Sequence, residues 1–383
     1  MNVLYVCTDW NQLYGSSCSL LNILNGLKGS EYHPVVLICR EGIVSEHFRS
    51  LGYEVLVHPF FFVSQRAYPL LSILHRPSRI RFWQYFHGDK ECTRYVVRQL
   101  TGRKIDVVHS NSSIATIGSN LAKALNAKHI WHVREFLDKD FHLNVFLGKR
   151  RLRSIIDTAD LRICISKAVA AHWNFKGDTK IIYNAIRKSG DAVYYPDKER
   201  YILFCAGNVS SLKGADFALR AFALSGIWKR GYSIMFVGDC TDVYKAELLT
   251  IARQYGVAEE ILAFKGHQTD VKPFFERASA FLMCSPNEAL GRVTIEAMFY
   301  GCLVIGRNTG GTPEIIRQAE TGYLFSTEED CARILEKIPD KDNSHLILNA
   351  QDFAKSVFSE EVYCPQIKRL YDSLACGKFT SRP

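Results

Sequence analysis

The sequence predicts two doubly wound α/β domains, each built on a parallel sheet that is covered by helices. Short β-branched apolar runs alternate with longer amphipathic segments along most of the chain. Helical crossovers bury such strands on both faces, which is why these strands form continuous apolar runs. The alternation stops at a polar stretch, KSGDAVYYPDKER at residues 188–200, and then starts again. The 383 residues also exceed one ordinary domain and suit two.

In the first half, the apolar runs predict strands and the segments between them predict helices. The expected strands are residues 3–7, 35–38, 54–57, 105–109, 129–132, 161–165 and 180–183. The expected helices are residues 17–27, 43–51, 115–125, 149–158 and 167–173. This order predicts repeated β-α-β units and a parallel sheet.

The second half repeats the arrangement after the polar stretch. The expected strands are residues 201–205, 233–237, 261–264, 280–283, 303–305 and 322–325. The expected helices are residues 215–224, 243–255, 271–277 and 291–300, with a short one from Pro313. We expect domains at 1–190 and 191–355, and a C-terminal helix in 356–383 that crosses back to the first domain. Parallel sheets bind ligands at the carboxyl ends of their strands, so we expect both domains to face a shared cleft.

The composition excludes a disordered chain, since 47% of the residues are apolar and 23% are charged. Apolar runs such as 60–63 and 280–284 are far shorter than the roughly 18 residues of a membrane-spanning helix. The N-terminus, MNVLYVCTDW, has no basic region and reaches an acid at Asp9. We interpret it as a strand rather than an export signal, and expect a cytoplasmic protein.

The twelve cysteines are scattered, with no CxxC pair and no histidine at metal-ligand spacing. Several lie in apolar runs, where a reduced thiol behaves as a small apolar side chain. We therefore expect a reducing compartment, no structural metal and no cofactor. The net charge of +9 indicates an anionic partner, which could be a nucleotide, a lipid headgroup or a nucleic acid.

One segment, residues 63–104, contains no clear strand and interrupts the alternation. Its only acids are Asp89 and Glu91, while aromatic residues alternate with nine basic ones: Arg66, Arg76, Arg79, Arg81, Lys90, Arg94, Arg98, Arg103 and Lys104. Basic and aromatic residues together suit an anionic interface. An inserted helical pair that packs its aromatic side chains on its own domain is the other interpretation.

The strongest functional signal is SPNEALGRVTIE at residues 285–296. A strand ends just before it, a loop holds Glu288, and a helix begins at Gly291 and contains Glu296. The start of a helix offers free N–H groups and a partial positive charge, and glycine lets a diphosphate come close. The two carboxylates can accept hydrogen bonds from sugar and ribose hydroxyls, which indicates a nucleotide sugar. Two acids at this spacing would on their own more often be solvated helix residues.

With this motif and several others, the chain resembles the retaining glycosyltransferases of family 4, which have the GT-B fold of two Rossmann-like domains. The resemblance covers nearly the whole chain. In the second half it rests on residues 207–214 (GNVSSLKG), 264–271 (FKGHQTDV), 280–296, 296–305 (EAMFYGCLVI) and 310–325 (GGTPEIIRQAETGYLF). In the first half, Gly15, His132, Ser166 and Asn184 match more loosely.

The resemblance implies a role for each matched residue. Glu296 would hold the nucleotide ribose, and Glu288 would contact the donor sugar. Lys213 would neutralise the leaving phosphate, and His132 would contact the sugar near the reacting carbon. For His132 a purely structural role is the alternative.

The resemblance also implies further contacts with the donor. They come from Gly15, Asn208, Gly266, His267, Leu290, Gly291 and Arg292, with Gly291 and Arg292 meeting the diphosphate through their backbone. Gly15 could equally be a plain turn. Asn208 stands where many members carry arginine, so one of two cations facing the diphosphate is missing, and Arg292 could compensate.

The resemblance implies transfer from a UDP- or GDP-sugar to an acceptor hydroxyl with retention, without a metal, by displacement on one face of the sugar. The basic segment 63–104 favours a lipid-linked acceptor, such as a polyprenyl-diphosphate saccharide of cell-surface polysaccharide assembly, reached from the cytoplasmic face of a membrane. Two alternatives remain. One is a sugar-nucleotide epimerase of the same architecture. The other is a noncatalytic module that binds nucleic acid, for which the sequence contains no recognisable motif.

Overall fold

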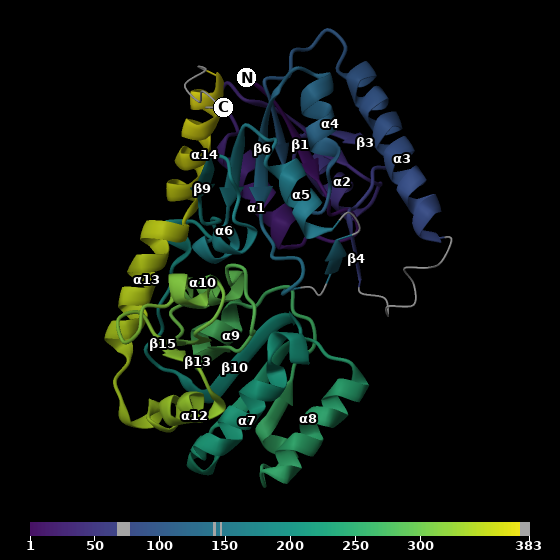
Figure 1. Cartoon of the computed structure of the whole chain (residues 1–383). Coiled ribbons are helices and arrows are strands. Elements are labelled where there is room, and N and C mark those ends of the chain that lie inside the picture. The colour runs from purple at the N-terminus through teal and green to yellow at the C-terminus, as the bar shows by residue number, and fades with distance from the viewer. Residues whose placement is uncertain (67–76, 141–142, 146–147, 376–383) are drawn as a thin grey trace. The chain divides into compact units, whose positions relative to one another are not determined.

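The computed structural model describes residues 1–66, 77–140, 143–145 and 148–375 (Figure 1). The chain divides into two compact units. The first consists of Met1–Asn184 and Tyr363–Pro383, and the second of Ala185–Val362. Each unit contains a parallel sheet with helices, which confirms the predicted fold class.

The sheet of the first unit has seven parallel strands in the order β3-β2-β1-β5-β6-β8-β9. Their bounds are β1 Asn2–Cys7, β2 His33–Ile38, β3 Glu54–Val57, β5 Val107–Ser110, β6 Lys128–Val133, β8 Leu161–Cys164 and β9 Thr179–Ile181. The helices are α1 Gly15–Gly26, α2 Ile43–Ser50, α3 Pro77–Gln99, α4 Ile117–Ala124, α5 Lys149–Ile156, α6 Lys167–Trp173 and α14 Glu360–Ala375. The order reverses at β1, which lies between β2 and β5.

The sheet of the second unit has six parallel strands in the order β12-β11-β10-β13-β14-β15. Their bounds are β10 Glu199–Asn208, β11 Ser233–Asp239, β12 Leu262–Phe264, β13 Ala278–Met283, β14 Val304–Arg307 and β15 Tyr323–Phe325. The helices are α7 Ala215–Ser225, α8 Asp242–Gln254, α9 Lys272–Arg277, α10 Arg292–Phe299, α11 Thr312–Ile315, α12 Glu328–Glu336 and α13 Ser344–Phe358. The order reverses between β10 and β13, so the loops that follow these two strands are neighbours.

Two features of segment 63–104 differ from the expectation. Residues Ser64–Arg66 form a strand, β4, which pairs antiparallel with β7 at Leu143–Val145. The prediction of no strand was wrong here because Ser64, Gln65 and Arg66 are all polar and form no apolar run. The rest of the segment includes one long helix, α3. Residues 67–76, Arg76 among them, lie outside the described part of the chain.

The division between the units falls at Asn184 and Ala185, six residues before the expected boundary. The reason lies in two backbone hydrogen bonds that attach the chain after Asn184 to the second unit: Ile186 N–H donates to Phe358 O and Glu360 N–H to Arg187 O. The C-terminal helix joins the first unit from Tyr363 onward. Its Tyr371 hydroxyl donates to the Tyr5 hydroxyl at 3.0 Å.

Within the described ranges, no helix is long and apolar enough to cross a membrane.

Candidate functional site

The loop after β13 and the start of α10 form the centre of the site. Gly291 lies at the N-cap of α10 with φ of 97°, a left-handed conformation that favours glycine. A Cβ atom here would lie 3.4 Å from the Glu288 side chain. The bend at Gly291 therefore places the free N–H groups of α10 directly after the loop that holds Glu288.

Lys213 and Glu288 are in contact. Lys213 ends a short 3-10 helix after β10, and its Nζ lies 3.2 Å from Oε2 of Glu288. Both side chains are partly exposed, at 34% and 18%. With Gly207 and the ends of β10 and β13 they line a cavity of about 80 Å³. The structure thus brings together the two second-unit residues that the sequence predicts to be catalytic.

Two glycines allow the close approaches that hold this loop. Gly214, with φ of 77°, starts α7 against the end of β13, where a Cβ would lie 2.4 Å from Cys284 O. A Cβ atom at Gly310 would lie equally close to Glu288 O, at 2.4 Å. The next residue, Gly311, donates its N–H to that oxygen at 2.7 Å. The GG pair at 310–311 therefore fixes the backbone of Glu288, which its sequence position alone does not show.

Glu296 lies in α10 and has a partner that the sequence analysis missed. Arg187 Nη2 lies 3.4 Å from Glu296 Oε1, and the Glu296 side chain is only 15% exposed. Arg187 also lies over the ring of Tyr300, and its Nε is buried with no hydrogen-bond partner among the described residues. Arg187 lies about a hundred residues before Glu296, and no motif in the sequence signals this pairing.

The remaining predicted second-unit residues lie at the carboxyl ends of neighbouring strands or beside α10. Asn208 ends β10 opposite Asp239 of β11, and His267 Nδ1 lies 3.8 Å from Asp239 Oδ2. Gly266 O accepts a hydrogen bond from Gly238 N–H at 2.8 Å. Leu290 is buried, whereas Arg292 is partly exposed at the first position of α10. Leu290 therefore presents little side-chain surface to a ligand.

In the first unit, Gly15 is exposed and begins α1. No sequence motif marks Asp9 as part of this loop, yet its carboxylate anchors the start of α1. Asp9 Oδ2 accepts hydrogen bonds from the Ser16 hydroxyl at 2.6 Å and from Ser17 N–H at 3.0 Å. The loop between β1 and α1 is thus held by a carboxylate that competes with any anion for the start of α1.

His132 lies in β6, as expected, but it has no exposed surface. Its Nδ1 lies 3.3 Å from His109 Nε2 and 3.2 Å from Arg134 Nη2. Its Nε2 is buried without a hydrogen-bond partner among the described residues. His109 Nδ1 lies 2.7 Å from the Tyr371 hydroxyl, so the network reaches the C-terminal helix. The predicted contact between His132 and a donor sugar stays a prediction.

The two histidines of this network are neutral at pH 7. Burial lowers the pKa of His132 and of His109 well below the usual range, and the charge of Arg134 lowers each further. In the unfolded chain these histidines have a pKa of about 6.5 and take up protons as the pH falls through that value. In the folded chain they stay neutral to lower pH, so acid favours the unfolded state. Their stabilising contribution is therefore complete above the unfolded pKa and is lost as the pH falls below it.

Substituting His132 should reduce the acid sensitivity of folding. The free energy of unfolding of His132→Gln should fall less than that of wild type between about pH 7.5 and about pH 4.5, by at least about 1 kcal/mol. Urea denaturation of both proteins at the two pH values measures this difference. Parallel pH dependences would show that His132 titrates alike in the folded and unfolded states.

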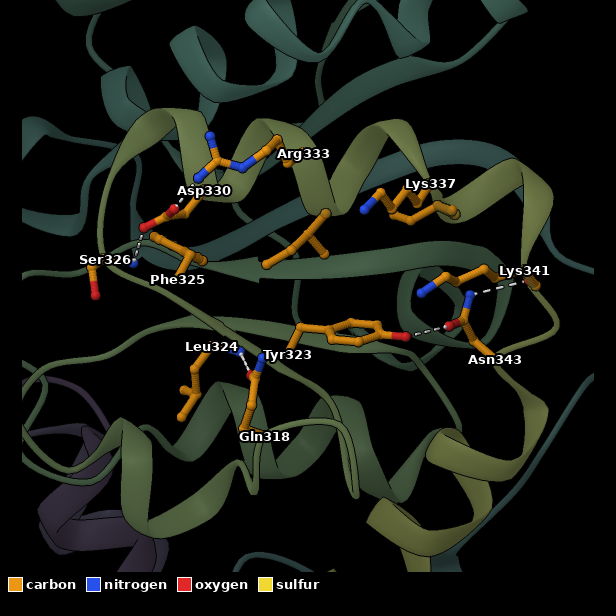
Figure 2. Close-up of a pocket in the computed structure, with 12 residues that line it drawn as sticks. Gln318, Tyr323, Leu324, Phe325, Ser326, Asp330, Arg333, Lys337, Lys341 and Asn343 are labelled. Carbon is orange, nitrogen blue, oxygen red and sulfur yellow. Dashed lines mark hydrogen bonds and ion pairs between the residues drawn. The ribbon is translucent and has the colours of Figure 1, made fainter.

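A larger cavity of about 460 Å³ lies elsewhere in the second unit, along β15 and α12 (Figure 2). Arg333 pairs with Asp330 on its wall, and the Gln318 side chain accepts the N–H of Leu324 on the edge strand β15. None of the predicted site residues lines this cavity.

The described ranges contain no group of three His, Cys, Asp or Glu side chains placed to hold a metal ion.

Two family models match the chain, one in each half. Residues 19–189 match the model described as Glycosyltransferase Family 4. Residues 190–351 match the model described as Glycosyl transferases group 1. Together the two matched ranges include every strand of the two parallel sheets except β1, and every predicted site residue except Gly15.

Individual relatives are distant. The N-acetyl-alpha-D-glucosaminyl L-malate synthase of Bacillus anthracis is 23% identical over 221 residues, covering 58% of this chain and 57% of that enzyme. An uncharacterized 41.2 kDa protein in the cps region of Klebsiella pneumoniae is 26% identical over 267 residues, covering 63% of this chain and 70% of that protein. The chain therefore matches little more than half of the Bacillus enzyme's length.

A solved structure resembles the whole chain. The Anabaena protein HepE in complex with UDP has a TM-score of 0.80 at 18% identity, covering 97% of this chain and 100% of that one. The same protein has also been solved with UDP-glucose. At this level of identity the likeness shows a shared fold.

Proposed function

Since the chain belongs to the glycosyltransferases of group 1 and family 4 and has their GT-B fold, we propose that it transfers a sugar, with retention, from a nucleoside-diphosphate sugar to an acceptor hydroxyl. One observation carries the proposal: Lys213 and Glu288 meet beside the glycine-capped start of α10. A cation and free N–H groups suit a diphosphate, and a partly exposed carboxylate beside them suits sugar hydroxyls.

The donor would lie along α10. Its diphosphate would accept hydrogen bonds from the N–H groups at the start of the helix and from Lys213. Glu288 would bind the sugar, and Glu296, further along α10, would bind the ribose. Arg187 neutralises Glu296 and holds its carboxylate in place until the ribose arrives. The complexes of HepE with UDP and UDP-glucose support a UDP-sugar as the donor.

In the proposed reaction, the bond from the anomeric carbon to the diphosphate oxygen breaks and a bond to the acceptor oxygen forms on the same face. The acceptor proton passes to the departing phosphate oxygen. No enzyme nucleophile is required. Negative charge grows on the departing nucleoside diphosphate, and Lys213 with the start of α10 stabilises it without a metal. The protein contributes orientation and charge stabilisation.

Arg292 should supply the cation that Asn208 does not. It occupies the first position of α10 and is partly exposed, while Asn208 ends β10. We expect Arg292→Ala to lower kcat/KM by about tenfold or more, and Asn208→Arg to restore part of the loss when the two changes are combined. Steady-state kinetics of the three variants tests this. Wild-type kinetics for Arg292→Ala would rule out compensation.

We propose a lipid-linked saccharide as the acceptor, in cell-surface polysaccharide assembly at the inner face of the cytoplasmic membrane. The basic and aromatic residues of segment 63–104 support this, and so does the place of the Klebsiella relative in a cps region. The Bacillus relative is named an N-acetyl-alpha-D-glucosaminyl L-malate synthase, so a small soluble acceptor is the alternative to test.

A screen of nucleotide sugars tests the donor. Thermal shift measurements with UDP-, GDP- and ADP-sugars should show one nucleotide class that raises the unfolding temperature, with its sugar adding to the effect of the nucleotide. Glu296→Ala should remove the shift with that class, which ties the binding to α10. A protein that none of these nucleotides stabilises would contradict the proposed donor site.

A further inference from the structure

A second cavity, in the first unit, has a strongly basic lining. It encloses about 580 Å³ between α3, α4 and α5, three helices that are labelled in Figure 1. Lys90 and Arg94 reach it from α3, Lys123 from α4 and Arg151 from α5. We call it the α3–α5 pocket. A cavity of this size accommodates a small ligand or a headgroup.

The four cations of this pocket have no acidic ion-pair partner among the described residues. All four side chains are exposed, and within the described part of the chain none forms an ion pair. Lysines nearby in the same unit are paired: Lys128 with Asp160 and Lys149 with Asp138. Four unpaired cations around one concave surface repel each other, so an anion bound among them would be stabilised by all four.

Among the described residues that line the pocket, Asp89 is the one acid, and it is 2% exposed. Its Oδ1 accepts the N–H of Phe61 at 3.2 Å, whereas its Oδ2 is buried with no hydrogen-bond partner among the described residues. Burial raises the pKa of Asp89 to about 7. Near neutral pH this carboxyl is therefore partly protonated, and even when ionised it offsets only one of the four positive charges. Asn120, on α4, adds an exposed amide donor to the lining.

We propose that the α3–α5 pocket binds the phosphate of an anionic membrane-lipid headgroup. The charge and the amide donor match phosphate oxygens. The lipid source is favoured because α3 is continuous from Pro77 to Gln99, and its sequence before Lys90 includes Phe82, Trp83 and Phe86. A sequence that combines basic with aromatic residues suits a membrane surface better than a free phosphate ion. The inference rests on the proposed function, because it gives the first unit a contact with the membrane that carries the acceptor.

Sedimentation with vesicles tests the pocket. The probe is phosphatidylcholine vesicles with and without phosphatidylglycerol, and the variant is Lys123→Glu/Arg151→Glu. A matched control, Lys176→Glu/Lys180→Glu, changes the net charge equally at two exposed lysines of the same unit that do not line the pocket. We expect wild type to bind only the anionic vesicles, the pocket variant to lose at least about tenfold in partition coefficient, and the control to lose under about threefold.

Two further measurements are needed. One distinguishes a lipid headgroup from a free phosphate ester as the ligand, and the other distinguishes failure of the α3–α5 pocket from failure of the proposed function. Glycerol 3-phosphate, titrated by NMR, tests whether the pocket takes a free phosphate, and the nucleotide-dependent thermal shift reports the donor site of the second unit. Equal losses in the pocket variant and the control would overturn the inference. So would binding of glycerol 3-phosphate by a wild type that ignores anionic vesicles. If the pocket fails either test but nucleotides still raise the unfolding temperature of the wild-type protein, the proposed function stands. If no nucleotide raises that temperature, the proposed function itself is contradicted.

Discussion

Glu296→Ala is expected to weaken the binding of both the nucleoside diphosphate and the nucleotide sugar by about 10- to 100-fold, because a hydrogen bond to a charged group contributes about 1.5–3 kcal/mol. Glu288→Ala is expected to leave nucleoside-diphosphate affinity near wild type and to lower turnover. The expected difference follows from where the two carboxylates lie. Glu288 lies in the loop before α10, beside Lys213, whereas Glu296 lies within α10, beside Arg187. The two carboxylates would contact different parts of one donor.

Isothermal titration with the nucleoside diphosphate, together with steady-state kinetics, separates the two effects. Glu296→Gln is the control for folding, since it keeps the size of the side chain beside Arg187 and removes only the charge. It should fall between wild type and Glu296→Ala in affinity. If Glu296→Ala and Glu288→Ala both kept wild-type kinetics at saturating and at limiting donor, the assignment of both residues would be wrong.

Lys213→Ala is expected to cost roughly 2–4 kcal/mol of transition-state stabilisation, or about 30- to 10³-fold in kcat. The lysine holds Glu288 in the ground state at 3.2 Å, and this pair is partly exposed, so its ionic contribution to stability is small. The main effect of Lys213 should appear in the transition state, when negative charge grows on the leaving phosphate. Stability should therefore change little while turnover falls.

The matched control is Lys337→Ala, an exposed lysine of the same unit that lines the cavity of Figure 2 instead. Both variants lose one positive charge, and only Lys213→Ala should lose turnover. Kinetics at saturating donor measures the comparison. Equal turnover in the two variants would remove Lys213 from the catalytic machinery.

The sequence predicts the two sheets well because most of their strands are continuous apolar runs and their crossover helices are amphipathic. The family resemblance assigns Lys213 and Glu288 to one donor site, and the structure adds that the two side chains are in contact, each after one of two neighbouring strands where the strand order reverses. The pairing of β4 with β7 could not be predicted, because each strand has three residues and the two are distant in sequence.

Long-range packing explains the other differences. Nothing near Glu296 in the sequence points to Arg187, and only the folded second unit brings them together. The place of His132 in β6 was predictable, but its complete burial was not. It depends on His109 and on Tyr371 of the C-terminal helix, which pack around it from distant parts of the sequence. The hydrophobic pattern of a helix or strand predicts which of its faces is buried. It does not predict which side chains from distant parts of the sequence cover that face.

The most direct test of sugar transfer is acceptor-dependent release of nucleoside diphosphate. The protein is incubated with the nucleotide sugar that stabilises it, with and without lipid-linked saccharides, and both the released nucleotide and the sugar products are measured. The proposed function predicts release that requires the acceptor, with one sugar added to it and its anomeric configuration retained. Release without any acceptor, accompanied by an epimerised sugar, would contradict transfer and identify an epimerase.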